Sequence, residues 1–164
     1  MKMTMVKILF VGAFILCFAV PVSFAEGLGM QASTRISPLS INEGLIGLKI
    51  APGSFAFTPI GGVGFSDQDK SDNIFIFTVG SGFDYYFSEE KLRPYVGGDI
   101  YIDYVNAYDS DIAFTLNPHL GAEYWLTDKF SIGGNIGFQF GFGEILGSDM
   151  RFGTTTMMHA TYYF

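Results

Sequence analysis

The chain has 164 residues, enough for one domain. Charged residues make up 15% and aromatic residues 17% of the sequence, a composition too apolar and too aromatic for a disordered protein. The formal net charge of −7 excludes the basic surface typical of a nucleic-acid-binding protein.

The first 25 residues have the pattern of a cleaved signal peptide. Lys2 and Lys7 form a positive n-region, residues 8–20 form an apolar h-region, and residues 23–25 end in alanine. The apolar run is too short for a membrane-spanning helix, which needs about 20 residues. We therefore expect Sec-type export, cleavage after residue 25 and a mature domain at 26–164. Cys17, the only cysteine, lies in the segment removed, so we expect neither a disulfide nor a thiolate metal site.

After residue 25, apolar and polar residues alternate with a period of two, which is typical of β-strands. Turn-forming pairs such as Pro52-Gly53 and Thr127-Asp128 separate the alternating segments. The predicted strands are 28–36, 44–51, 54–65, 73–87, 94–108, 111–126, 129–145 and 150–164. Because short turns join antiparallel neighbours, the pattern predicts an all-β fold, an eight-stranded antiparallel up-and-down barrel. An even number of strands suits a closed transmembrane barrel.

The segment 131–143, SIGGNIGFQFGFG, indicates which face points outward. One face carries Phe138 and Phe140, and the other carries Asn135, Gln139 and glycines without any charge. A soluble barrel would place charged residues on its exterior, so this polar face is a poor exterior. An eight-stranded barrel also has little interior volume for rows of aromatic side chains. We therefore predict that the apolar face contacts lipid; the alternative is a soluble secreted ligand-binding barrel of inverted polarity.

Aromatic residues gather at the end of the predicted barrel that has the short turns, as Tyr and Trp do at a membrane–water boundary. Together with the signal peptide, the eight alternating strands and the terminal HATYYF, this pattern resembles the small eight-stranded outer-membrane barrels of the outer-membrane protein A and X type. The resemblance implies the outer membrane of a Gram-negative bacterium as location. It also implies outer-membrane lipid, lipopolysaccharide and the barrel-assembly machinery as partners, with Tyr162 and Phe164 in the assembly signal. It leaves the oligomeric state open.

Two prolines fall inside predicted strands of a sheet that should have no free edge. Pro59 and Pro118 each remove a backbone donor from the ladder. We therefore expect a local bulge or a displaced hydrogen bond at each of them.

The alternation places nine ionisable residues inside the barrel: Arg35, Lys49, Asp84, Asp99, Asp103, His119, Glu123, Arg151 and His159. Charges removed from bulk water must be paired, so we interpret this set as a structural network that fills the lumen. Five of the set are expected nearer the short turns, namely Lys49, Asp84, Asp99, Glu123 and His159. Arg35, Asp103 and Arg151 are expected nearer the other end.

Two functional alternatives remain for these residues. A proton or ion path through the lumen is one of them. The other is enzymatic modification of lipid A, which some small outer-membrane barrels perform. Acyl transfer needs a nucleophile beside a histidine, and neither His119 nor His159 has a serine next to it on its own strand face. We therefore expect no enzyme activity, no cofactor and no metal site.

Overall fold

The computed structural model describes residues 27–36, 43–68, 71–106, 110–145 and 148–164. The predicted signal peptide lies outside these ranges. The described residues form eight strands: β1 (Leu28–Ile36), β2 (Glu43–Ile50), β3 (Phe55–Gln68), β4 (Ser71–Tyr86), β5 (Leu92–Asn106), β6 (Ser110–Thr127), β7 (Phe130–Ile145) and β8 (Ser148–Tyr163). In these ranges no helix is long and apolar enough to cross a membrane.

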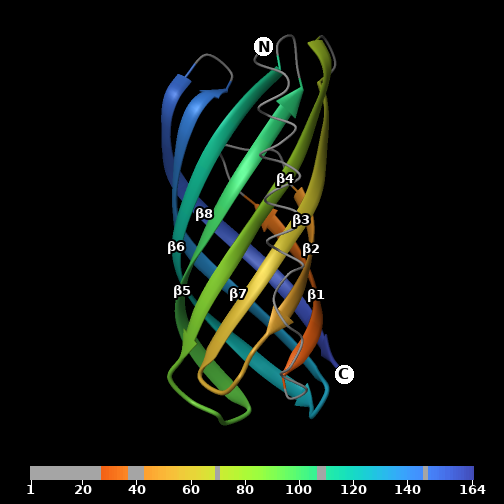
Figure 1. Cartoon of the computed structure of the whole chain (residues 1–164), viewed down its shortest axis with the longest axis vertical. Helices are drawn as coiled ribbons and strands as arrows, with labels where there is room; N and C mark the ends of the chain where they lie inside the picture. The colour runs from red at the N-terminus through yellow and green to blue at the C-terminus, as the bar shows by residue number, and fades with distance from the viewer. Residues whose placement is uncertain (1–26, 37–42, 69–70, 107–109, 146–147) are drawn as a thin grey trace.

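The eight strands form a closed barrel in which each strand pairs with its neighbours in the sequence, and β8 pairs with β1. All pairs are antiparallel, as predicted. Following the paired residues once around the barrel leads from Thr161 to Arg151, which is ten residues nearer the start of β8. This displacement is the stagger that closure requires, and the strands are visibly tilted against the long axis (Figure 1).

The side chains have the polarity predicted for a transmembrane barrel. Phe138 is 54% exposed and Leu120 61%, whereas Asn135 and Gln139 are 4% and 3% exposed. Among the described residues, twenty-six large hydrophobic side chains are exposed. This arrangement is the opposite of a soluble ligand-binding barrel, in which apolar side chains would line the interior.

The aromatic residues at the short-turn end divide between the two faces. We call this end, with the turns 51–54, 87–91 and 128–129, the lower end; it is at the bottom of Figure 1. Tyr85, Tyr124 and Tyr162 are exposed on the outer wall, where an interfacial belt is expected. Tyr86 and Tyr163 are 5% exposed and point into the lumen. The belt therefore contains only part of the aromatic set that the sequence suggested.

Of the two outcomes expected at each proline, the structure shows interrupted pairing and no bulge, because the ladder is broken without a shift of its register. Next to Pro59, the pairing of β2 with β3 passes from Gly47–Ile60 to Ile50–Phe57 in one register. Next to Pro118, the pairing of β6 with β7 is interrupted in the same way. The actual irregularities lie near strand ends, at 66–68, 125–127 and 142–145. At the last of these Gly143 has φ of +120°, which favours glycine.

Candidate functional site

The lower lumen is organised around the Glu123 carboxylate of β6. It lies 2.7 Å from the Lys49 ammonium and is 1% exposed. The hydroxyls of Tyr86 and Tyr163 donate to it at 2.5 and 3.1 Å, and the Ser131 hydroxyl donates a further short hydrogen bond. One carboxylate thus accepts from four side chains on four other strands. A charged group in a low-dielectric interior requires an opposite charge and hydrogen bonds of this kind to offset its lost hydration.

Aromatic and cationic side chains lie beside the Glu123 cluster. Trp125 stacks on Tyr163, with ring centroids 4.5 Å apart and planes at 22°. The Arg93 guanidinium lies over the indole at 4.5 Å and also donates to the backbone carbonyls of Glu89 and Glu90 in the 87–91 turn. This contact joins the wall of the lumen to a lower turn, as a cation–π interaction allows.

The middle of the lumen holds a histidine between two carboxylates. His119 Nε2 lies 2.9 Å from Asp84 Oδ1, and its Nδ1 lies 3.2 Å from Asp99 Oδ2. The Asn117 amide also donates to Asp99, at 2.8 Å. Gly97 makes this approach possible, because a Cβ there would lie 2.2 Å from the Asp84 carboxylate.

The upper lumen is centred on Arg35 of β1. One guanidinium nitrogen lies 2.6 Å from Glu43 and 3.3 Å from Asp103. The Thr78 hydroxyl is 2.9 Å from the first carboxylate and 2.8 Å from the second, so it can donate to either one. The guanidinium also lies 4.4 Å from the centre of the Tyr101 ring. These contacts link β1, β2, β4 and β5 across the interior.

The structure brings seven of the nine sequence-predicted residues into these three clusters. Arg151 and His159 remain outside them. His159 is 7% exposed, and neither ring nitrogen has a hydrogen-bond partner among the described residues. Arg151 Nε is likewise without a partner there. The clusters also form three levels instead of the two that were expected, because Asp84 and Asp99 contact His119 and not the Lys49–Glu123 pair.

Glu43 is a charged member that the sequence analysis missed. It is 1% exposed and pairs with Arg35. The predicted second strand began one residue too late to include it. Its position, six residues before Lys49 in a period-two strand, was the signal that places it on the lumen face.

The described residues contain no group of three His, Cys, Asp or Glu side chains that could hold a metal ion. The carboxylates in the three clusters are instead bonded to protein cations, hydroxyls, an imidazole and an amide. The lumen chemistry visible here is therefore that of paired charges and hydrogen bonds.

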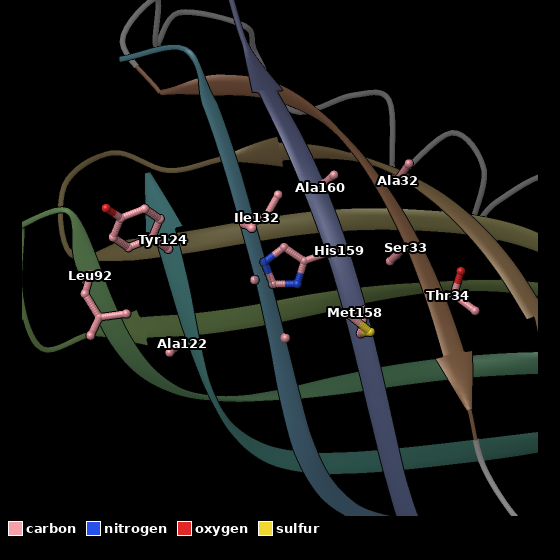
Figure 2. Close-up of a pocket in the computed structure, with 12 residues that line it drawn as sticks. Ala32, Ser33, Thr34, Leu92, Ala122, Tyr124, Ile132, Met158, His159 and Ala160 are labelled. Atoms are coloured by element: carbon pink, nitrogen blue, oxygen red, sulfur yellow. The ribbon is translucent and has the colours of Figure 1, made fainter. Parts of the chain in front are cut away.

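A groove with a volume of about 650 Å³ lies on the barrel wall and extends over the neighbouring strands β6, β7, β8 and β1 (Figure 2). Its lining is mostly apolar and includes Ala32, Tyr124, Ile132, Met158 and Ala160. Most of these residues have the outward parity of their strands and are partly or largely exposed. The groove is therefore a feature of the lipid-facing wall.

Two solved structures share this architecture. The chain matches Neisserial surface protein A with a TM-score of 0.58 at 12% identity, over 84% of this chain and 94% of that one. It matches the N-terminal β-barrel domain of Pseudomonas aeruginosa OprF with a TM-score of 0.59 at 15% identity, over 84% and 97%. The chain has the fold of an eight-stranded transmembrane β-barrel.

At these identities, the likeness shows the fold of the barrel and not its activity. No protein-family model and no curated protein matches the sequence.

Proposed function

We propose that the protein is an integral outer-membrane β-barrel of a Gram-negative bacterium with a structural or surface role and no wide pore. The observation that carries the proposal is the saturated Glu123 cluster below two further clusters of paired side chains. Tyr95 and Tyr101 are 2% and 0% exposed and occupy space between the charged groups. Paired charges and buried rings among the described residues support an interior without a wide path.

The surroundings of His159 support a role without catalysis. The serine nearest to His159 in the ladder is Ser33, its cross-strand neighbour on β1. Both side chains have the lumen parity and are 7% exposed, and the Ser33 hydroxyl has no hydrogen-bond partner among the described residues. A nucleophile for acyl transfer would have to contact its base and an acyl group. Neither the Ser33 hydroxyl nor a ring nitrogen of His159 has a hydrogen-bond partner among the described residues, so the two are not paired as nucleophile and base, although both line the groove on the wall.

The outer wall fits outer-membrane lipid and lipopolysaccharide as surroundings. Export by the Sec route and insertion by the barrel-assembly machinery belong to the same proposal. Tyr162 and Phe164, the proposed assembly signal, are 50% and 63% exposed on the outer wall. Deleting Phe164 should lower the assembled fraction, measured by heat-modifiable gel migration; the internal substitution Phe138→Ala is the control.

The test of the main proposal has two measurements. After urea washing, the protein should stay in the outer-membrane fraction and migrate faster on a gel before heating than after it. In planar bilayers, the purified protein should show no large steady channels, whereas the double variant Tyr95→Ala/Tyr101→Ala should conduct more. Release into the aqueous fraction would refute membrane insertion, and large steady channels in the wild type would refute a filled lumen. Unchanged lipid A acyl chains on expression are the expected result for a protein that is not an enzyme.

A further inference from the structure

Three buried polar side chains of the lumen face have atoms that no described residue satisfies. Ser33 lies on β1, Asn135 on β7 and His159 on β8, and each is at most 7% exposed. The Ser33 hydroxyl, the Asn135 side-chain oxygen and both ring nitrogens of His159 lack a hydrogen-bond partner among the described residues. Such atoms are rare in protein interiors, and bound water is a common partner for them. We call these three residues the polar set.

The register of the barrel places the polar set in one small region. Ser33 is directly across from His159 in the pairing of β1 with β8, and Gly133 is across from His159 in the pairing of β7 with β8. Asn135 follows two residues after Gly133 and therefore has the same parity on β7. Opposite and diagonal neighbours on one face of a sheet are close enough to share a partner.

The imidazole ring of His159 leans toward β7 and away from Ser33. A Cβ added to Gly133 would lie 2.5 Å from Nε2 and 2.8 Å from Cε1 of this ring. β7 and β1 flank β8 on opposite sides. Figure 2 shows the ring on the β7 side of β8 and Ser33 on the β1 side. Because Gly133 has no side chain, the ring can lie over it, and the serine hydroxyl is left without a direct contact to the ring.

The polar set lies between the lower and the middle clusters. On β7, Asn135 is midway between Gly133, which pairs with Glu123, and Gly137, which pairs with His119. Tyr95 connects the two levels. Its ring centre is 5.8 Å from that of His119 and 6.3 Å from that of His159, and its hydroxyl is hydrogen-bonded to the side chain of Asn135.

The unsatisfied atoms suit water better than an ion. A neutral imidazole has one donor and one acceptor, a serine hydroxyl can donate and accept, and an amide oxygen accepts. A buried water makes about three hydrogen bonds of both kinds. The charged groups that act on the His159 ring are Lys49, Glu123, Asp84 and His119. Each of these four is already paired with another of them, so no unpaired charge among them attracts an ion.

We propose that the lumen binds one ordered water molecule between Ser33, Asn135 and His159. This water joins β1, β8 and β7 by hydrogen bonds that the three side chains do not make directly, and so it crosses the pairing that closes the barrel. The inference rests on the proposed function, because it identifies what fills this level of the lumen in an inserted barrel.

A polar group of a lipid or detergent is the rival occupant. Ser33, Gly133 and His159 also border the wall groove, so a molecule in the groove has a way to approach them. The other lining residues of the groove are mostly apolar. The polar set has the lumen parity, which favours water, and the experiment below separates the two occupants.

NMR spectroscopy of the mature protein in phosphocholine and in maltoside micelles tests the site. The carbon-bound Hε1 proton of His159, assigned with the variant His159→Phe, should give a nuclear Overhauser cross-peak to water in both detergents. This peak should have the sign of the intramolecular cross-peaks, as for a water that stays bound. The Ile60 methyl groups are the internal control and should give none, since they are buried in an apolar cluster with Leu45, Tyr101 and Met157.

A matched pair of variants tests the role of the serine. Ser33→Val removes the hydroxyl and fills the space beside it, so the cross-peak should weaken by about fivefold, the change in occupancy that one lost hydrogen bond produces. Thr34→Val removes the neighbouring hydroxyl, which has the outward parity, and should leave the peak unchanged. A crystal structure of the wild type is an independent readout. It should show a water oxygen about 2.7–3.2 Å from at least two members of the polar set.

Three results would overturn the inference: no water cross-peak at His159 in a folded barrel, equal peaks in Ser33→Val and the wild type, or cross-peaks to detergent in place of water. Heat-modifiable migration is measured on the same samples. A barrel that inserts without the bound water contradicts this inference alone. A protein that fails to insert, or a peak with the sign of mobile solvent, contradicts the proposed filled barrel.

Discussion

Glu123 and His159 are both buried on the lumen face, yet their surroundings differ. Glu123 accepts hydrogen bonds from four side chains, including the ammonium of Lys49. His159 has no hydrogen-bond partner among the described residues, and its ring lies against Gly133. The difference indicates that the hydrogen-bond donors of this part of the lumen gather around the charged carboxylate. The imidazole ring, which can be neutral, is buried without hydrogen bonds to the described residues. Substitutions at the two places should therefore differ greatly in cost.

Glu123→Leu should have the largest effect. It leaves the Lys49 ammonium buried without its carboxylate, which costs about 3–5 kcal/mol. Urea unfolding in vesicles, followed by gel migration, measures the loss. The double variant Lys49→Met/Glu123→Leu removes both charges and should recover most of it. If the double variant is as unstable as the single one, the ion pair is not the source of the effect.

Gly97→Ala should disturb the middle cluster by about 1–3 kcal/mol. The added Cβ would lie 2.2 Å from Asp84 Oδ1 and 2.7 Å from His119 Nε2. The control is the adjacent Gly98→Ala, whose Cβ would meet nothing closer than 3.8 Å. Equal unfolding free energies for the two variants would show that the middle cluster has room to move.

Thr78→Val should cost about 1–2 kcal/mol, because it removes one donor shared by Glu43 and Asp103 while Arg35 remains. The same unfolding assay applies, with Ser81→Ala on the outer face of β4 as the control. A loss no larger than that of the control would indicate that Arg35, together with the Thr115 hydroxyl that donates to Asp103, satisfies the two carboxylates without Thr78.

His159→Phe should have the smallest effect, below about 1.5 kcal/mol, because the ring it replaces makes no hydrogen bond with the described residues. Unfolding measurements at neutral pH check this value. A loss as large as that of Glu123→Leu would show that His159 has a partner and would remove the contrast between the two sites.

The strand pattern could be predicted closely because each wall residue contacts either lipid or lumen. The first strand, 28–36, has the predicted bounds, and the others differ by at most three residues at either end. Period-two alternation predicts whether a side chain points toward lipid or toward the lumen, and this prediction does not require knowledge of the residue's cross-strand partner. For the same reason, the interior position of Lys49 and Glu123 could be read from the sequence, although their contact could not.

The contents of the lumen were harder to predict because they depend on register. The volume argument disfavoured large aromatic rings inside, yet Tyr95 and Tyr101 are buried there. Each lies across from a glycine on the neighbouring strand, Gly121 and Gly80 respectively. A Cβ at these glycines would lie 2.4 and 2.6 Å from the tyrosine rings. Such large–small pairs become visible only once the cross-strand partners are known.

The pairing of β1 with β8 has a consequence for how the molecule is made. These two strands lie at opposite ends of the described chain. The contacts that close the barrel therefore join residues far apart in sequence, such as Gly29 and Tyr163. Contacts of such long range form slowly, since the intervening chain must first be ordered. Until β8 is in place, the backbone groups on one edge of β1 therefore have no strand partner. Biogenesis of the barrel must protect this edge during that time.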